Sequence, residues 1–373
     1  MTASGERLPA TGAARLPERI AARVPALASG DGAARIAVRL PNWTGDAVMA
    51  TPALRALRAG FPRARISALV REGLAPLLEG LAHCDEVVSL RSWRRGAVAL
   101  LDEARALRAH RFDLGVCLPD SWSSALLLRA AGVACVVGHA RAGRAPLLHV
   151  AVAPERAWGP RRRVARELRA LHVVEAIGCP PRGTHLELAI GARDASEADA
   201  LLAAGGLAPR DAFVALAPGA SYGDAKRWPP ASFARVADGL AEIGVRAVVV
   251  GAPEEAELAR AVARAASCEV VDLVGRAGLG ALKAVLARAR ALVANDAGAR
   301  HVAVAVGTPA VVLFGPTDLA RTDCNLERVT PLATDVPCRP CGRRSCPIDG
   351  RCMAGIAPEA VLQAVRSALA GAT

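Results

Sequence analysis

Residues 289–318 read ARALVANDAGARHVAVAVGTPAVVLFGPTD and predict a complete strand–helix–strand unit. One apolar run ends at Asn295, and a second one begins at Pro309. The residues between them, 298–306, are typical of a buried helix that begins at Gly298. A strand, a helix and a second strand in this order imply a right-handed crossover between parallel strands. The segment therefore predicts a parallel sheet that is covered by helices.

The same alternation of short apolar strands and alanine- and arginine-rich helices occurs in both halves of the chain. In the first half we expect strands at residues 35–40, 64–70, 86–90, 113–118 and 134–139. In the second half we expect strands at residues 212–217, 245–251, 269–273, 289–295 and 309–315. Helices are expected between the latter at about 230–243, 254–266, 279–288 and 298–306. Nearly continuous apolar strands are typical of parallel sheets covered on both faces. The two series predict an α/β protein with two Rossmann-like domains that face one cleft.

Glycine and proline residues near 178–183 separate the two series and mark the expected domain boundary. The predicted parts are an N-terminal extension, an N-terminal domain, a C-terminal domain and a terminal segment, at residues 1–34, 35–182, 183–355 and 356–373. We expect the extension to be flexible, because it is rich in Ala, Pro, Gly and Arg and has no apolar signal-peptide core. The terminal segment contains a predicted helix at 358–370, which we expect to pack back toward the first domain.

The composition restricts the kinds of partner. The 373 residues are 53% hydrophobic and only 3% aromatic, so the core must consist mostly of Ala, Val and Leu. A net charge of +12 fits nucleic acid, an anionic membrane surface or acidic small molecules, although arginines on solvated faces would give the same total. The chain contains no run of about 18 uncharged apolar residues, which argues against a membrane span. Without an export signal, the ten cysteines are expected to be reduced thiols or metal ligands.

The loop GASYGDAKRWPP, residues 219–230, gathers residue types that the chain otherwise rarely uses. It contains Lys226, one of only two lysines among 47 basic residues, together with Tyr222, the only tyrosine. The loop follows a predicted strand and precedes a predicted helix, so Lys226 lies close to a helix N-terminus. A flexible point charge at that place is a suitable phosphate partner. We expect Lys226 to bind phosphate, and Tyr222 and Trp228 to anchor the loop by burying their rings.

A second candidate phosphate site follows the predicted strand that ends at Asn295. Free backbone N–H groups where Gly298 begins a helix suit a pyrophosphate. Asp296 could accept hydrogen bonds from sugar hydroxyls, or it could cap the helix. His301 is one helical turn further along, where a lone histidine is more often structural than functional.

The loop NWTGD, residues 42–46, follows the first predicted strand. A carboxylate at Asp46, beside Gly45, could take a proton from an attacking hydroxyl, or it could cap the next helix. The dinucleotide fingerprint G-x-G-x-x-G does not occur in the chain, which argues against an NAD-dependent enzyme.

A cysteine-rich segment, CRPCGRRSCPIDGRC at residues 338–352, has four cysteines within fifteen residues. They are Cys338, Cys341, Cys346 and Cys352. Four thiolates at this spacing could hold a structural zinc or an iron–sulfur cluster. The sequence therefore predicts a structural clip in this segment, without an open coordination position.

Five segments together resemble the ADP-heptose:lipopolysaccharide heptosyltransferases of glycosyltransferase family 9, most closely the heptosyltransferase II branch. They are RLPNWTGDAVMATPALRAL, PGASYGDAKRWPPASFA, GAPEE, NDAGARHVAVAVGTPAVVLFGPTD and the cysteine-rich segment. The resemblance implies the GT-B fold and inverting transfer of a heptose from ADP-heptose to the lipopolysaccharide inner core. It also implies a cytoplasmic enzyme in peripheral contact with the inner membrane, without a catalytic metal or other cofactor and without nucleic acid as a partner.

The resemblance assigns roles position by position. Asp46 corresponds to the general base, Lys226 to a catalytic cation, and Glu255 to the acidic residue near the nucleotide ribose. The donor-binding set is Gly45, Ser221, Tyr222, Lys226, Glu255, Asp296, Ala297, Gly298 and His301. The family usually has a small hydroxyl residue where Ala297 stands and commonly a methionine where Arg300 stands. Arg300 either adds charge near the donor or points to solvent. The departures at Ala297 and Arg300 bear on the identity of the transferred sugar more than on the class of reaction.

Three alternatives stay open at the level of the sequence. The first is a family relative that uses another nucleotide sugar or acceptor, which donor-dependent thermal shifts would reveal. The second is a nucleic-acid-binding protein that uses the cysteine-rich segment and the basic surface, against which the few aromatic residues argue. The third is a catalytically inactive sensor of sugar nucleotides, which the presence of Asp46 and Lys226 disfavours.

Overall fold

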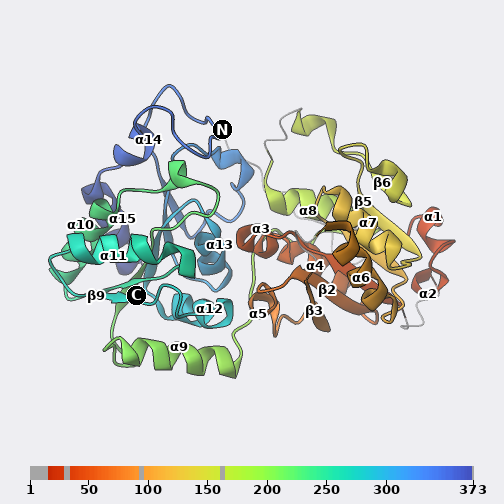
Figure 1. Cartoon of the computed structure of the whole chain (residues 1–373), viewed down its shortest axis with the longest axis horizontal. Coiled ribbons are helices and arrows are strands. Elements are labelled where there is room, and N and C mark those ends of the chain that lie inside the picture. Colours follow the sequence, from red (N-terminus) through yellow and green to blue (C-terminus); the bar gives the residue numbers. More distant parts are fainter. Residues whose placement is uncertain (1–15, 29–33, 92–95, 160–163, 372–373) are drawn as a thin grey trace.

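The structure is a computed structural model that describes residues 16–28, 34–91, 96–159 and 164–371. Two six-stranded parallel sheets form two lobes, each covered by helices on both faces (Figure 1). The first sheet consists of β1 (Arg35–Arg39), β2 (Arg65–Arg71), β3 (Glu86–Leu90), β4 (Leu114–Cys117), β5 (Cys135–His139) and β6 (Val150–Val152). The second consists of β7 (Phe213–Ala217), β8 (Arg246–Val249), β9 (Val270–Asp272), β10 (Ala291–Asn295), β11 (Ala310–Leu313) and β12 (Val329–Leu332). The predicted pair of Rossmann-like domains is confirmed.

The helices divide between the lobes in chain order. The first lobe carries α1 (Glu18–Ala21), α2 (Pro25–Ala28), α3 (Thr44–Val48), α4 (Thr51–Gly60), α5 (Ala75–Leu78), α6 (Gly96–Arg108), α7 (Trp122–Ala130) and α8 (Arg166–Glu175). The second carries α9 (Ala192–Ala204), α10 (Pro230–Ala241), α11 (Ala256–Ala265), α12 (Leu279–Arg288), α13 (Gly298–Ala305), α14 (Arg351–Ala354) and α15 (Pro358–Ala370). Pro230 occupies the first turn of α10, where its missing N–H has no helical partner to lose. The chain passes from the first lobe to the second between α8 and α9.

Both sheets have the same strand order. The first runs β3-β2-β1-β4-β5-β6. The second, read from its other edge, runs β9-β8-β7-β10-β11-β12, which is the same order when β7 is counted as the first strand. The order reverses between β1 and β4 in one sheet and between β7 and β10 in the other. Ligands of open parallel sheets bind beyond the carboxyl ends of the strands at such a reversal. The two loops and the helix start that the sequence singled out follow β1, β7 and β10, so all three lie at these reversals.

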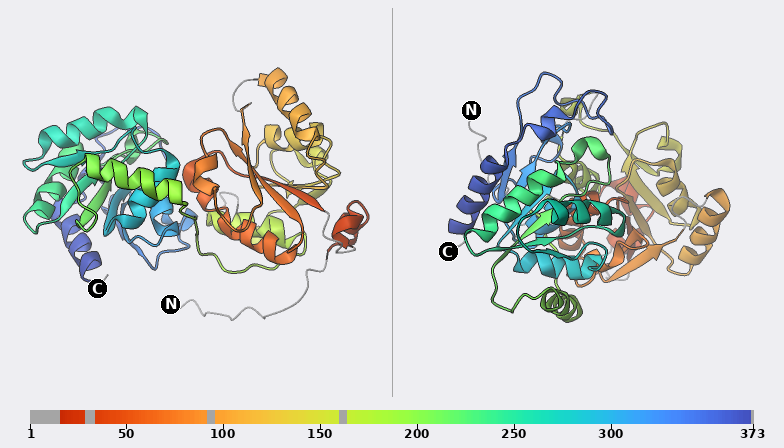
Figure 2. Two further views of the ribbon diagram at one scale, coloured as in Figure 1. Left: turned by 90° about the horizontal axis from the view of Figure 1, so that it is seen from below. Right: turned by 60° about the vertical axis from the view of Figure 1, so that its left-hand side comes forward.

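The C-terminal helix α15 packs on the second lobe, so the prediction that it packs toward the first domain is wrong (Figure 2). Val361 and Val365 are fully buried against α10, β10 and β11. Gly239 in α10 leaves room for Leu362, since a Cβ at Gly239 would lie 2.4 Å from Leu362 Cδ2. The physical reason is that Val361 and Val365 complete the apolar cluster that α10 forms with the second sheet.

Part of the N-terminal extension is also better ordered than its composition predicts. Residues 16–28 form α1 and α2, and Ile20 and Val24 bury their side chains in the core that they share with the first sheet. Two apolar side chains at a spacing of four residues are sufficient to dock so short a segment. The extension was also predicted to be flexible at residues 1–15 and 29–33, which lie outside the described residues.

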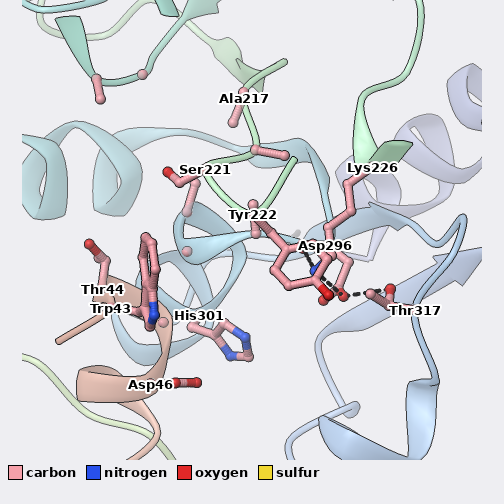
Figure 3. A pocket seen from close by; sticks show the side chains of 18 of the residues that line it. Trp43, Thr44, Asp46, Ala217, Ser221, Tyr222, Lys226, Asp296, His301 and Thr317 are labelled. Atoms are coloured by element: carbon pink, nitrogen blue, oxygen red, sulfur yellow. Dashed lines mark hydrogen bonds and ion pairs between the residues drawn. The ribbon is translucent and has the colours of Figure 1, made fainter. Parts of the chain in front are cut away.

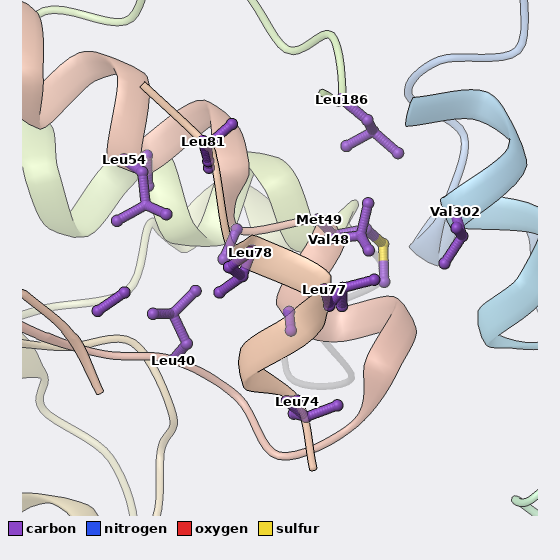
Figure 4. Packing of buried hydrophobic residues seen from close by; sticks show 14 of the residues in the cluster. Leu40, Val48, Met49, Leu54, Leu74, Leu77, Leu78, Leu81, Leu186 and Val302 are labelled. Atoms are coloured by element: carbon purple, nitrogen blue, oxygen red, sulfur yellow. The ribbon is translucent and has the colours of Figure 1, made fainter. Parts of the chain in front are cut away.

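The two lobes share one apolar cluster across their boundary. Val48 of α3, Met49 directly after it and Leu77 of α5 belong to the same buried cluster as Val302 of α13 (Figure 4). Burial of apolar surface stabilises the contact by roughly 25 cal/mol per Å² removed from water. The carboxyl end of β1 is therefore held against the start of α13 by packing, before any ligand binds.

A buried carboxyl group also bridges the lobes. Glu167 of α8 is 1% exposed, and its Oε1 accepts a hydrogen bond of 3.2 Å from Asn325 Nδ2 of the second lobe. Its Oε2 is buried and has no hydrogen-bond partner among the described residues. Burial raises the pKa of Glu167 to about 7, although the hydrogen bonds and the charge of Arg300 act in the opposite direction. Glu167 thus becomes charged in the folded protein only when the pH approaches neutrality.

We predict that Glu167→Gln removes a pH-dependent loss of stability. Because the pKa of Glu167 is about 7 in the folded chain against an ordinary value of 4.5, the folded state binds more protons between these values. Stability is then fully present below pH 4.5 and falls as the pH rises to 7. The free energy of unfolding of Glu167→Gln minus that of wild type should therefore increase by on the order of 2–3 kcal/mol as the pH rises through this interval.

Urea unfolding at a series of pH values measures this difference. Glu72→Gln, at an exposed position of the same lobe, is the control and should follow the wild-type pH profile. A constant difference between Glu167→Gln and wild type from pH 4.5 to pH 7 would contradict the assignment.

Candidate functional site

A cavity of about 1140 Å³ lies between the lobes, at the reversal points of both sheets. All ten residues of the predicted catalytic and donor-binding sets line this cavity: Gly45, Asp46, Ser221, Tyr222, Lys226, Glu255, Asp296, Ala297, Gly298 and His301. In Figure 3 Asp46 and Trp43 lie on the side of the first lobe, and Lys226 and Tyr222 on the side of the second. The structure therefore brings together groups that are up to 256 positions apart in the chain, as Gly45 and His301 are.

Lys226 is held at the end of β10 by Asp296. Its Nζ donates hydrogen bonds to the backbone oxygen of Asp296, at 2.7 Å, and to Asp296 Oδ2, at 3.1 Å. The Lys226 and Asp296 side chains are only 14% and 9% exposed. Ion pairs this well buried are costly to break from one side, because the remaining charge is left uncompensated. The lysine is thus fixed in one position at the wall of the cavity.

The carboxylate of Asp296 is held by three side chains of the protein. Oδ2 also accepts a hydrogen bond of 2.7 Å from Thr317 Oγ1, and Oδ1 lies 3.3 Å from Arg300 Nε. Burial acts to raise the pKa of Asp296, but Lys226, Arg300 and Thr317 outweigh it and hold the pKa below its ordinary value. Ala297 occupies the N-cap of α13, so Asp296 does not cap that helix, and its carboxylate anchors Lys226 instead. The expectation that Asp296 accepts hydrogen bonds from sugar hydroxyls stays a prediction.

Arg300 is buried beneath this ion pair, so the alternative that it points to solvent is wrong. It is 2% exposed, and its Nη2 donates to the backbone oxygen of Thr322 at 3.1 Å. Its Nε also donates to His301 Nε2 at 3.2 Å. Burial, and then the charge of Arg300, hold the pKa of His301 well below its ordinary value, so this imidazole is neutral.

Two glycines permit the close approach of the lobes at the cavity floor. A Cβ at Gly45 would lie 2.8 Å from His301 Cδ2, and a Cβ at Gly298 would lie 3.2 Å from Thr44 Cβ. Larger residues would push α3 away from α13. Gly298 therefore makes room for the first lobe, as well as leaving the backbone N–H groups at the start of α13 accessible from the cavity.

Asp46 lies in the first turn of α3, whose N-cap is Trp43, so it does not cap that helix. Its Oδ1 is 3.7 Å from Arg166 Nε, and both side chains are partly exposed to the cavity. A carboxylate with one loose cationic neighbour keeps free lone pairs toward the cavity. Asp46 is the acidic side chain that the first lobe contributes to the cavity lining.

The loop after β7 is anchored by Trp228, as predicted, and not by burial of Tyr222. Trp228 is 1% exposed, its backbone N–H donates to Asn295 Oδ1 at 3.1 Å, and its Nε1 donates to the Ile356 oxygen at 3.1 Å. Tyr222 is 43% exposed, and its ring lies 5.2 Å from Lys226 Nζ. The prediction for Tyr222 is wrong, because the ring packs against cations at the cavity wall.

Glu255 follows β8 and faces the same cavity. Its Oε2 accepts a hydrogen bond of 3.0 Å from the backbone N–H of Ala252. A Cβ at Gly219 would lie 1.9 Å from the Glu255 carboxyl carbon, so only glycine fits at that position. Burial raises the pKa of Glu255, with the Ala252 hydrogen bond opposing it. The group can accept hydrogen bonds from a ligand that enters beside β8.

The cysteine-rich segment forms part of the cavity wall. Pro340, Cys341, Gly342 and Arg344 all line the cavity. Cys338, Cys341 and Cys346 are exposed and Cys352 is buried, and the described residues contain no group of three or more side chains arranged to hold a metal ion. The segment that was predicted to form a structural clip therefore also forms part of the cavity wall, beside the loop that carries Lys226.

Sequence reasoning missed several cavity residues. Trp43 is 46% exposed and lines the cavity beside Asp46, and Arg166, Thr317 and Arg344 also line it. Thr317 follows β11 in the sequence GPTD, so its place at a strand end was a signal that could have identified it. Arg166 and Arg344 have no such signal, because they are two among many arginines.

Comparisons with known proteins identify the family of the chain. Residues 101–351 match glycosyltransferase family 9 (heptosyltransferase). Lipopolysaccharide heptosyltransferase 2 of Escherichia coli K12 is 28% identical over 295 residues, which cover 76% of this chain and 83% of the relative. Lipopolysaccharide heptosyltransferase 1 of Pseudomonas aeruginosa PAO1 is 28% identical over 313 residues, which cover 81% and 84%.

Two solved structures have the same fold. E. coli ADP-heptose lipopolysaccharide heptosyltransferase II has a TM-score of 0.77 at 23% identity, over 90% of this chain and 99% of that one. An E. coli heptosyltransferase with ADP has a TM-score of 0.65 at 21% identity, over 91% and 99%. The GT-B fold implied by the resemblance is confirmed. The chain belongs to glycosyltransferase family 9, and it is a glycosyltransferase.

Proposed function

We propose that this glycosyltransferase transfers a heptose from ADP-heptose to the inner core of lipopolysaccharide, with inversion at the anomeric carbon. The observation that carries the proposal is that Asp46 from one lobe and Lys226 with the start of α13 from the other line a single cavity. Names of the relatives support the donor and the acceptor, since they are lipopolysaccharide heptosyltransferases and one similar structure contains ADP.

The proposed reaction is a single displacement. Asp46 takes the proton of an acceptor hydroxyl as its oxygen attacks the anomeric carbon of the heptose. The bond from that carbon to the diphosphate oxygen breaks on the opposite face, and ADP leaves with the bonding electron pair. Asp46 and Lys226 line the cavity from different lobes, which supports a base and a leaving group on opposite sides of the sugar.

The second lobe would stabilise the charge that grows on the leaving diphosphate. Lys226 supplies a fixed cation, and the free N–H groups at the start of α13 add the positive end of a helix dipole. Fixed charges that face a leaving group are usually a large contribution to catalysis. In this scheme the transfer needs no metal or other cofactor, because the protein supplies the positive charge itself. Glu255 would accept a hydrogen bond from the ribose.

The acceptor would enter from the side of the first lobe. Lipopolysaccharide core is anionic and membrane-bound, so part of the net charge of +12 would attract the chain to that surface. None of the helices formed by the described residues has the length and hydropathy of a membrane span. A cytoplasmic protein in peripheral contact with the inner membrane is the arrangement we propose. A structural zinc at the four cysteines of the cysteine-rich segment stays a prediction of the sequence.

The function is tested by a donor screen followed by a transfer assay. ADP-, GDP- and UDP-sugars are compared for the rise in melting temperature that each one causes. We expect ADP-heptose to give the largest rise, and ADP to be released when a heptose-deficient lipopolysaccharide core is added. A preference for another sugar nucleotide would favour the alternative of a different family relative. Steeply salt-dependent binding of nucleic acid without any transfer would favour the nucleic-acid alternative.

Asp46→Asn should separate binding from chemistry. An amide keeps the shape of the side chain but cannot take a proton, so kcat should fall by roughly 10²- to 10⁴-fold. The affinity for the donor should change little, because all proposed donor contacts except Gly45 lie on the second lobe. Isothermal titration and a coupled assay of ADP release measure the two quantities. Asp318→Asn, at another carboxylate of the cavity, is the control and should lose far less. Near-normal turnover of Asp46→Asn would remove Asp46 from the role of base.

Lys226→Ala should weaken donor affinity and turnover together, each by roughly 10- to 1,000-fold, because the same charge acts on the bound and on the leaving diphosphate. Asp296 remains paired with Arg300 and Thr317, so the fold should survive. Arg227→Ala is the matched control, since Arg227 is exposed and does not line the cavity. Steady-state kinetics with varied donor check both parameters. If neither parameter moves, Lys226 does not bind the diphosphate.

A further inference from the structure

The cysteine-rich segment is fastened to the loop that carries Lys226 by three hydrogen bonds. Tyr222 Oη donates to the Gly342 oxygen at 2.7 Å, and Arg344 Nε donates to the Tyr222 oxygen at 2.8 Å. The backbone N–H of Ala225 donates to the Arg344 oxygen at 3.0 Å. A Cβ at Gly223 would lie 2.2 Å from this Arg344 oxygen, so the approach of the two backbones requires glycine there. The two segments therefore form one wall of the cavity.

Arg344 brings a charge to this wall that no carboxylate neutralises. It lines the cavity and, among the described residues, makes no ion pair with Asp or Glu. Lys226 differs in this respect, because Asp296 compensates its charge at 3.1 Å. The Tyr222 ring lies between the two cations, 5.2 Å from Lys226 Nζ and 5.5 Å from Arg344 Cζ. An aromatic face shared by two cations offsets part of their mutual repulsion.

We infer that Arg344 is a second binding residue for the donor diphosphate, delivered to the cavity by the cysteine-rich segment. The inference rests on the proposed function, since it needs a nucleoside diphosphate in the cavity. Asp296 neutralises only one charge of its two cationic neighbours, Lys226 and Arg300, and Arg344 adds to this wall a positive charge that none of the described carboxylates neutralises. A guanidinium can donate two parallel hydrogen bonds to phosphate oxygens, which a lysine cannot do. The cysteine-rich segment is then part of the donor site and not only a structural clip.

A purely structural role for Arg344 makes a different prediction. Its bond to the Tyr222 oxygen shapes the loop, and loss of that bond would weaken every ligand of the cavity to a similar degree. A charge that contacts phosphate affects ligands according to their phosphates. Adenosine, AMP and ADP have the same base and ribose and carry zero, one and two phosphates, so they separate the two roles.

The test measures the dissociation constants of adenosine, AMP and ADP by isothermal titration for wild type and Arg344→Gln. We expect ADP to bind roughly 10- to 100-fold more weakly to Arg344→Gln, since hydrogen bonds to charged groups contribute about 1.5–3 kcal/mol each. AMP should be affected less, and adenosine should bind as to wild type. Arg344→Lys should recover part of the ADP affinity by restoring the charge.

Arg343→Gln is the matched control. Arg343 is the preceding residue, it is exposed, and it does not line the cavity, so its removal lowers the net charge of the segment by the same amount. Its ADP affinity should equal that of wild type. Equal ADP affinity of Arg344→Gln and wild type would overturn the inference, and so would an equal loss for all three ligands. Failure of the wild-type protein to bind ADP would instead overturn the proposed donor. The titration of the wild-type protein alone shows this outcome, so the two failures are distinguishable.

Discussion

The contact between α3 and α13 is the constraint on which the site depends. Two helix starts from different lobes meet there, and a Cβ at Gly45 or Gly298 would come within 2.8 or 3.2 Å of the opposite lobe. Val48 and Val302 extend this contact into a shared apolar cluster. Without it, Asp46 and Lys226 would belong to two independent sheets. With it, both strand-order reversals open into one cavity, which is the geometry that transfer between two bound substrates requires.

Lysine is used in this chain only where a compact charge is buried. Lys226 pairs with Asp296 at the cavity, and Lys283, which is fully buried, pairs with Asp194 Oδ2 at 3.0 Å near the lobe boundary. A single ammonium can satisfy several acceptors from a narrow space, whereas a guanidinium needs a planar arrangement of partners. The pairing of Lys226 also has a consequence for the donor site. Because Asp296 compensates it, the attraction of a diphosphate depends on further cations, of which Arg344 is the one fastened to the same loop.

The strands and the site residues were predictable because they follow local rules. Parallel strands are continuous apolar runs, and the residues after them, such as Asp46 and Asp296, must lie at one edge of each sheet. The destination of α15 was not predictable, because it depends on which apolar face remains uncovered after the sheets form. The burial of Arg300 and the position of Arg344 were hidden for a similar reason. Both residues carry out their roles through contacts more than 20 positions away, with Thr322 and Tyr222, and the sequence shows them as ordinary arginines.

The account's central claim is a single displacement across the cavity, with the base on one lobe and the leaving group on the other. The anomeric configuration of the transferred sugar, determined by NMR on the product of the isolated chain and a heptose-deficient core, tests it most directly. We predict a configuration opposite to that of the donor. A product with the configuration of the donor would exclude a single displacement from the opposite face, and it would contradict the arrangement of Asp46 and Lys226 described above.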